Sequence, residues 1–133
     1  MVRKFLISLA ICTPVWATED GLTPTLRPLI LPALSSLEVV QHSVQAEPNQ
    51  EDCKTFTLTE QDVRNYFAQA DQIDHGDFTE VVEWSACQAT GTVEFDDGSR
   101  ANWRLQRYRA GQLVYPDGRE VYMYCERCGA PFE

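Results

Sequence analysis

The cysteines are the residues of this sequence whose type and spacing could do chemistry. Cys125 and Cys128 form a C-x-x-C pair near the end of the sequence, and Cys53 and Cys87 stand far apart upstream of it. A C-x-x-C pair can be half of a zinc site, a redox-active dithiol or a structural disulfide. The cellular compartment and the elements that carry these cysteines must decide between the three.

The first seventeen residues have the pattern of a secretory signal peptide. Arg3 and Lys4 form a basic start, residues 5–12 are an apolar run, and Ala17 is a small residue at the expected cleavage site. The apolar run is too short to cross a bilayer core of about 30 Å, which argues against a membrane anchor. The sequence therefore predicts cleavage after Ala17, loss of Cys12 with the signal, a periplasmic location and no membrane insertion of the mature chain.

The chain is acidic, with a net charge of −9. Without the signal peptide it has nine basic residues against twenty acidic ones. Nucleic-acid binding needs clustered Lys and Arg, so we expect no nucleic-acid partner. A basic protein partner fits this charge, although acidity also serves solubility.

The mature chain divides into a segment of residues 18–52 and a domain of residues 53–133. The first segment contains the prolines at positions 24, 28, 32 and 48 and no sustained apolar period. We interpret it as a flexible tether. One short helix is the alternative, because Ser35 and Glu38 have capping-box spacing.

The domain begins with a predicted strand and a predicted helix. Residues 53–58 alternate and are rich in Thr and aromatic residues, which is typical of a strand. Thr59 can cap a helix over residues 60–73, with Asp62 near its positive end. The helix is amphipathic, and its apolar stripe consists of Val63, Tyr66, Phe67, Ala70 and Ile73.

The rest of the domain is predicted to form strands joined by short turns. Strands are predicted over residues 79–87, 90–95, 100–108 and 120–125, with turns at 96–99, 110–112 and 115–119. Ala101, Trp103 and Leu105 should face inward, and Asn102, Arg104 and Gln106 outward. This order predicts an α+β fold, in which a single amphipathic helix packs on an antiparallel β-meander.

This topology bears on the cysteines. If the strand over 53–58 pairs antiparallel with the strand over 79–87, Cys53 lies beside Cys87, and their disulfide would stabilise the fold by about 3 to 4 kcal/mol. Cys125 is then left to pair with Cys128. That pair follows a strand, whereas redox dithiols usually open a helix. Crossed pairing of Cys87 with Cys125 or Cys128, and a zinc site made of all four cysteines, remain alternatives.

No other constellation in the sequence resembles a catalytic site. The sequence has two histidines, and His75, beside Gly76 in a polar turn, is more typical of a solvated residue than of a ligand. Asp96 and Asp97 are adjacent in a hairpin and cannot face each other across a substrate. We therefore predict that the protein is not an enzyme and holds no cofactor or metal.

Two resemblances extend this interpretation. A helix on an antiparallel meander resembles the cystatin-like inhibitors at the level of the fold, but QATG at residues 88–91 lacks the spacing of their inhibitory loop. FTLTEQDVRNYF (56–67), EWSACQATGTV (83–93) and YCERC (124–128) resemble a set of small periplasmic proteins of Gram-negative bacteria, over residues 53–128. Some exported proteins of this size and composition serve as immunity partners of interbacterial cell-wall toxins.

These observations predict a non-enzymatic inhibitor. We expect an immunity protein that binds a basic exported toxin, such as a peptidoglycan hydrolase or transpeptidase. The candidate partner-binding residues are acids in hairpin tips and tyrosines taken to be exposed: Asp96, Asp97, Asp117, Tyr108, Tyr115, Tyr122 and Tyr124. The alternatives are an envelope-assembly accessory subunit, and a thiol-active or zinc protein that uses Cys125 and Cys128.

Overall fold

A computed structural model of the chain describes residues 10–11, 23–45 and 52–133, without the side chains of 42–45. Apart from 10–11, the predicted signal peptide lies outside these residues. The described residues form an α+β fold with one main helix, a seven-stranded antiparallel sheet and two disulfides. Within these ranges, no helix has the length and apolar character needed to cross a membrane.

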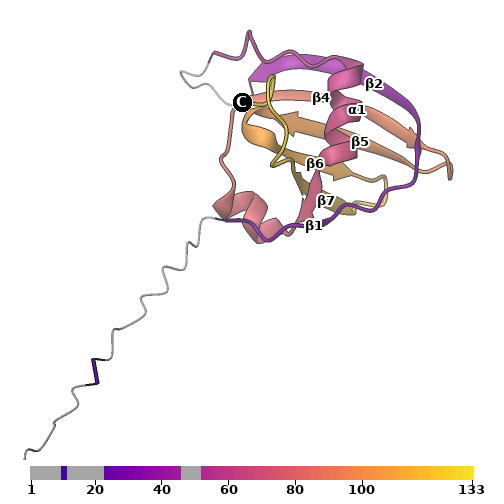
Figure 1. Cartoon of the computed structure of the whole chain (residues 1–133). Helices are drawn as coiled ribbons and strands as arrows, with labels where there is room; N and C mark the ends of the chain where they lie inside the picture. The colour runs from indigo at the N-terminus through magenta and orange to yellow at the C-terminus, as the bar shows by residue number, and fades with distance from the viewer. Residues whose placement is uncertain (1–9, 12–22, 46–51) are drawn as a thin grey trace, which may run out of the picture.

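The sheet has the strand order β1-β3-β7-β6-β5-β4-β2, and all neighbouring strands are antiparallel. Its strands are β1 (Arg27–Pro28), β2 (Leu34–Gln45), β3 (Asp71–Ile73), β4 (Cys87–Phe95), β5 (Arg100–Gln106), β6 (Ala110–Val114) and β7 (Glu120–Tyr124). The strands β4 to β7 follow one another in consecutive hairpins (Figure 1), which confirms the predicted antiparallel meander.

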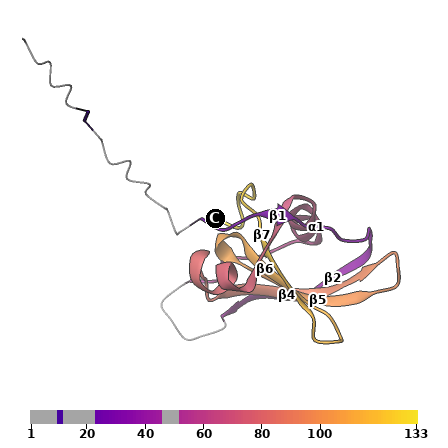
Figure 2. The same cartoon turned by 90° about the horizontal axis from the view of Figure 1, so that it is seen from below.

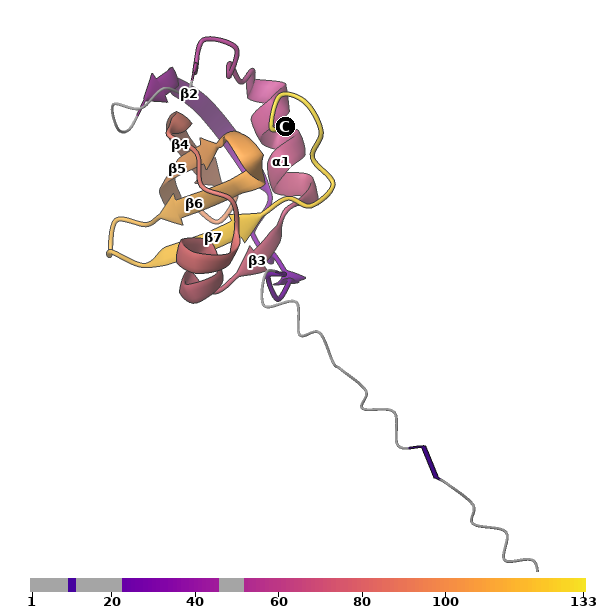
Figure 3. The same ribbon diagram turned by 90° about the vertical axis from the view of Figure 1, so that its left-hand side faces the viewer.

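The helix α1 (Glu60–Gln69) lies across one face of this sheet, as Figures 1, 2 and 3 show. The predicted cap is confirmed: Thr59 and Asp62 form a capping box, with Thr59 Oγ1 accepting from Asp62 N at 3.1 Å. The helix ends at Gln69, so its predicted extension to Ile73 is wrong. Ala70 takes an extended conformation, and the next three residues form β3 and pair with β7.

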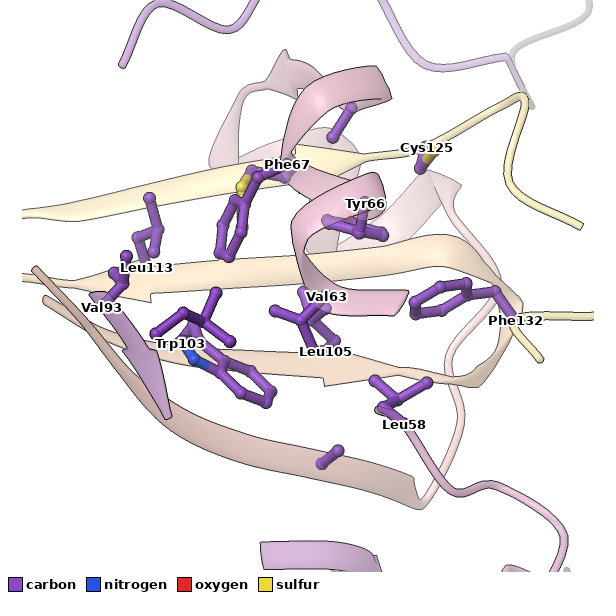
Figure 4. Packing of buried hydrophobic residues seen from close by; sticks show 14 of the residues in the cluster. Leu58, Val63, Tyr66, Phe67, Val93, Trp103, Leu105, Leu113, Cys125 and Phe132 are labelled. Atoms are coloured by element: carbon purple, nitrogen blue, oxygen red, sulfur yellow. The ribbon is translucent and has the colours of Figure 1, made fainter. Parts of the chain in front are cut away.

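The core lies between α1 and the sheet (Figure 4). Trp103 and Leu105 point toward the helix and are buried, which confirms the inward face predicted for β5. Tyr66 is fully buried, its hydroxyl donates to the carbonyl of Arg109 at 2.8 Å, and burial raises its pKa well above 10.0. Gln106, predicted to face outward, is buried, and its side-chain oxygen accepts from Ser85 N at 3.0 Å.

The predicted tether contains two strands, so the tether interpretation is wrong for the described part of 18–52. β1 tolerates Pro28 because a proline without a donor fits an edge strand. β2 is twelve residues long and pairs with β4, so the alternative helix capped by Ser35 is also absent. Residues 29–33 cross from one sheet edge to the other on the side of α1 (Figure 2), and Leu29 and Leu31 pack against the core.

Three further predicted elements are wrong. Residues 53–58 form a turn and an extended loop, because Phe56 N donates to Cys53 O at 3.0 Å and closes the chain on itself. Residues 79–87 contain the end of a π-helical turn (Asp77–Val81) and a loop, and a strand begins at Cys87. Residues 110–112 are the start of β6, and the turn lies just before them, where Tyr108 and Arg109 have φ of 69° and 79°.

Both predicted disulfides are present, Cys53–Cys87 and Cys125–Cys128. They use all four cysteines of the described domain, so the crossed pairing and the four-cysteine zinc site are not formed. The pairing of strands over 53–58 and 79–87, from which the Cys53–Cys87 disulfide was predicted, is nevertheless absent. Cys53 belongs to the loop between β2 and α1, not to a strand, and this loop brings it to the start of β4.

Candidate functional site

Two hairpin tips at one end of the sheet share the same sequence pattern and the same hydrogen bonds. Residues 95–98 (FDDG) connect β4 to β5, and residues 115–118 (YPDG) connect β6 to β7. Both tips lie at the end of the sheet away from the C-terminus (Figure 1). The repeat of an aromatic residue, any residue, aspartate and glycine gives the tips equivalent backbones.

In the first tip, Asp97 fixes the turn. Its Oδ1 accepts from Ser99 N at 2.9 Å and from Ser99 Oγ at 2.5 Å. Phe95 N donates to Ser99 O, and Gly98 N donates to Phe95 O, both at 2.9 Å. Gly98 has φ of 84°, a left-handed conformation that glycine adopts without a steric penalty.

The second tip repeats this geometry. Asp117 Oδ1 accepts from Arg119 N at 2.9 Å, and Gly118 has φ of 88°. Tyr115 N donates to Arg119 O at 2.9 Å, and Gly118 N donates to Tyr115 O at 2.9 Å. The predicted turns at 96–99 and 115–119 are thus confirmed, and Asp97 and Asp117 each have a structural role in them.

The tips are joined through their aromatic residues. The rings of Phe95 and Tyr115 are near parallel, with an interplanar angle of 20° and centroids 6.5 Å apart. The guanidinium carbon of Arg119 lies 4.1 Å from the centroid of the Tyr115 ring. Burial raises the pKa of Tyr115, Arg119 lowers it, and the charges of Asp97 and Asp117 raise it further. Carboxylates of both tips therefore act on the same phenol.

A hollow of about 430 Å³ lies between the tips, lined by residues of both hairpins: Gly98, Ser99, Arg100, Tyr115, Pro116, Asp117 and Arg119. Tyr115 and Pro116 give it an apolar wall. Carboxylates and guanidinium groups surround this wall, so the hollow suits a ligand group with an apolar stem and a charged end.

The tips carry a net negative charge. Residues 94–100 and 115–120 contain five acids and two arginines, which leaves a net charge of −3. Arg100 is turned back toward Glu94, with Nε 3.4 Å from Oε2, and Arg119 lies on Tyr115. The Asp96 carboxylate makes no hydrogen bond or ion pair with any residue that the structure describes, and it is exposed. The tips thus project carboxylates more than guanidinium groups.

The face of the sheet opposite α1 carries a shallow trough that meets this hollow. Two adjoining depressions of about 370 and 570 Å³ share Thr92, Asn102 and Val114 in their linings. The larger one reaches Arg100 and Pro116, which also line the hollow between the tips. A partner bound at the tips could therefore also contact the concave surface along β2, β4 and β5.

The other candidate tyrosines lie away from the tips. Tyr108 is half-buried in the turn between β5 and β6, and its N–H donates to Phe132 O at 2.7 Å. Tyr122 lies on the face of the sheet opposite α1, where its ring contacts His75 and Phe78 and its hydroxyl donates to Glu120. Tyr124 is half-buried too. Tyr115 is only 9 % exposed, so the exposure expected of this tyrosine is wrong.

The two tips contain four of the residues predicted from the sequence: Asp96, Asp97, Asp117 and Tyr115. Arg119, whose side chain covers the Tyr115 ring, was not among the predicted residues. The repeated aromatic-x-Asp-Gly pattern could have predicted equivalent tips. Their proximity depends on the register of three strand pairs, which the pattern does not contain.

Acid should loosen the first tip. The hydrogen bonds that Asp97 accepts from Ser99 lower the pKa of Asp97 below 3.8. They therefore contribute stability above the ordinary pKa, and this contribution is lost as the pH falls through the lowered value. In an NMR titration, we expect the Ser99 amide to shift with a midpoint below 3.8, and Asp97→Asn to remove this transition. A midpoint at or above 3.8 would contradict the assigned bonds.

Among the described residues, no group of three or more His, Cys, Asp or Glu side chains could hold a metal ion. No protein-family model, curated protein or solved structure matches the chain.

Proposed function

We propose that the protein is a non-catalytic periplasmic inhibitor that binds a basic exported protein through its two hairpin tips. The observation that supports this proposal most is that the Phe95–Tyr115 ring contact joins two tips whose net charge is −3. In the most specific form, the partner is a toxin directed at the cell wall, such as a peptidoglycan hydrolase or transpeptidase, and this protein confers immunity. That form rests on the sequence resemblance.

The rigidity of the tips favours binding. Each turn is closed by two backbone hydrogen bonds and by an aspartate that accepts from the residue two positions on. Such preorganised loops lose little conformational freedom on association, so less of the interaction energy is spent on ordering them. A protruding rigid hairpin can enter a concave site, which is where the substrate of an enzyme binds.

The charge of the tips favours a basic target. Negative potential on a projecting surface accelerates association with a positive cleft, by about 10- to 1000-fold at low ionic strength. The rest of the acidic chain adds to the same field. Strong salt dependence of the association rate is therefore part of the proposal.

An envelope-assembly accessory subunit is the second candidate. β2 is an edge strand of twelve residues, and within the described residues its outer side has no neighbouring strand. Exposed edges can accept a strand from another protein. A thiol-active protein finds less support, because Cys125 and Cys128 are 0 % and 6 % exposed and joined to each other. We retain the cystatin-like arrangement as a proposal at the level of the fold, with residues 88–91 inside β4.

Capture of the partner by variants of the tips tests the main proposal. Asp96→Asn, Asp97→Asn and Asp117→Asn together remove three charges, while asparagine keeps the acceptor oxygens that the turns use. The mature wild-type chain, immobilised and exposed to envelope extract of the source organism, should retain one basic exported protein in stoichiometric amount. The triple variant should bind that protein at least about tenfold more weakly, mainly through a slower association rate.

A matched control has the same change in net charge elsewhere. Asp52→Asn, Glu80→Gln and Glu83→Gln neutralise three exposed acids outside the tips. This control should bind like the wild type. Equal loss in both triple variants would mean that overall charge, not the tips, governs binding. Unchanged binding by the tip variant would contradict the proposal.

A further inference from the structure

Arg119 places a cation on the Tyr115 ring. Its guanidinium carbon is 4.1 Å from the ring centroid, well within the range of about 6 Å for a cation–π interaction. The backbone of Arg119 is held independently, since its N–H donates to Asp117 and its carbonyl accepts from Tyr115 N. The side chain is therefore able to leave the ring without opening the turn.

Carboxylates of both tips also influence this tyrosine. Asp97 belongs to one hairpin and Asp117 to the other, and both act electrostatically on the Tyr115 hydroxyl. The adjoining hollow of about 430 Å³ has an apolar wall that includes Pro116. The lining contains one carboxylate, that of Asp117, and also Arg100, which is turned back toward Glu94. An aromatic face, carboxylate charge from both tips and an apolar wall together form a receptor for a side chain that has an alkyl stem and a cationic end.

We propose that the hollow between the tips binds a guanidinium side chain of the partner, and that Arg119 occupies this place until the partner displaces it. This inference deepens the proposed function and rests on it. Its basis is the cation already seated on the ring, together with a space large enough for a second side chain. Arginine suits the site better than lysine, because a planar guanidinium can stack on the ring and donate to carboxylates in a fork.

Because Arg119 lies on the Tyr115 ring in the free protein, it lowers the affinity of the hollow for an arginine of the partner. A partner arginine must compete with Arg119, whose effective concentration at the ring is high because it belongs to the same hairpin. Removal of Arg119 should therefore uncover the site and raise its affinity for an added guanidinium compound. Displaced Arg119 would be solvated, since it is an exposed residue.

An NMR titration with a defined probe tests this inference. We would add N-acetyl-arginine methylamide to the ¹⁵N-labelled mature protein, as wild type, as Arg119→Ala and as the control Arg64→Ala. Arg64 is an arginine of α1 paired with Glu60, away from the tips. We expect saturable shifts of the amides at 98–99 and 117–119 in Arg119→Ala, with at least threefold higher affinity than in the wild type or in Arg64→Ala.

Two further titrations test whether the binding depends on the charge of the probe and on the carboxylates of the tips. The uncharged analogue N-acetyl-citrulline methylamide has nearly the same shape and should bind at least threefold more weakly to Arg119→Ala. Asp97→Asn and Asp117→Asn, added to Arg119→Ala, should lower the affinity for the arginine probe at least threefold while keeping both turns. No saturable shift in Arg119→Ala, or equal binding of the two probes, would overturn the inference.

The failure of this inference is distinguishable from failure of the proposed function. If the tip variant loses the captured partner but Arg119→Ala does not bind the arginine probe, the tips act through charge without this site, and this inference alone is overturned. If the probe binds as expected but no partner depends on the tips, the proposed function is overturned and the cation site stands.

Discussion

A Gly91→Ala variant should lose about 3 kcal/mol of its free energy of unfolding, the upper range of what overpacking of a core costs. Gly91 lies in β4, opposite Trp103 of β5 and Val39 of β2. A Cβ atom at this position would lie 2.0 Å from the backbone oxygen of Glu38 and 2.4 Å from Cζ2 of Trp103. Atoms cannot approach this closely, so the structure around the alanine must move.

Movement of Glu38 and movement of the Trp103 ring would each cost free energy. Within the described part of the chain β2 is attached to the sheet through β4, so moving Glu38 away breaks hydrogen bonds of that pair. Moving the Trp103 ring disturbs a side chain that is 1 % exposed and packs in the core beneath α1. Both responses cost packing or hydrogen bonds that the wild type keeps.

Thermal unfolding measured by circular dichroism checks this prediction. For a domain of this size, a loss of about 3 kcal/mol lowers the Tm by about 10 °C or more. Gly76→Ala is the matched control, because its Cβ would meet its nearest neighbour at 3.5 Å, an ordinary contact. If both variants unfold at the same temperature as the wild type, the close packing of β2, β4 and Trp103 is wrong.

Loss of the Cys53–Cys87 disulfide should be comparably costly. A double Cys53→Ala, Cys87→Ala variant should lose about 3 to 4 kcal/mol, because the bridge closes a loop of 34 residues in the unfolded chain. Both cysteines are buried, and the bridge fixes the loop before α1 to the start of β4. The described part of that loop, residues 52–59, belongs to no strand, and the bridge attaches it covalently to the sheet.

The second disulfide provides the internal comparison. Cys125 and Cys128 are three positions apart, and the same chain-entropy model gives their bridge about 2 kcal/mol. Urea unfolding of the two double variants at neutral pH should therefore rank Cys53→Ala, Cys87→Ala as the less stable. The reverse order would show that loop closure does not dominate, and that the C-terminal segment contributes more through Phe132 and its contacts with Tyr66.

The elements that were predicted correctly are those determined by short-range patterns. The alternation in β5, the capping box at Thr59 and the Asp-Gly turns each depend on residues within a few positions of one another. The meander follows from consecutive hairpins, which need no long-range information. The α+β class could therefore be predicted before the structure was known, whereas the Cys53–Cys87 pair was predicted from a strand pairing that the described residues do not form.

The strands β1 and β2 were missed because their partners are distant in sequence. Leu34 pairs with Phe95 and Arg27 with Gln72, and no local pattern predicts such a register. The prolines suggested a tether, whereas Pro28 is tolerated at the sheet edge. The opposite error occurred at 53–58, where an alternating pattern lies in a loop that is fixed by a disulfide and by buried Phe56 and Leu58.

The candidate site was predicted in its parts and not in its arrangement. The acids at 96, 97 and 117 were recognisable because Asp-Gly pairs mark exposed turns. Sequence could not show that Tyr115 is buried against Phe95, or that Arg119 folds back over its ring. Those contacts arise from strand pairing across the whole meander.

Photo-crosslinking at a tip tests the central claim most directly. We would place p-benzoylphenylalanine at Asp96 and, in a separate control chain, at the exposed Gln61 of α1, and irradiate living cells of the source organism. The proposal predicts a covalent adduct of the tip variant with a basic exported protein, and no such adduct at position 61. Adducts at position 61 with none at position 96, or a tip adduct with proteins that are not basic, would contradict it.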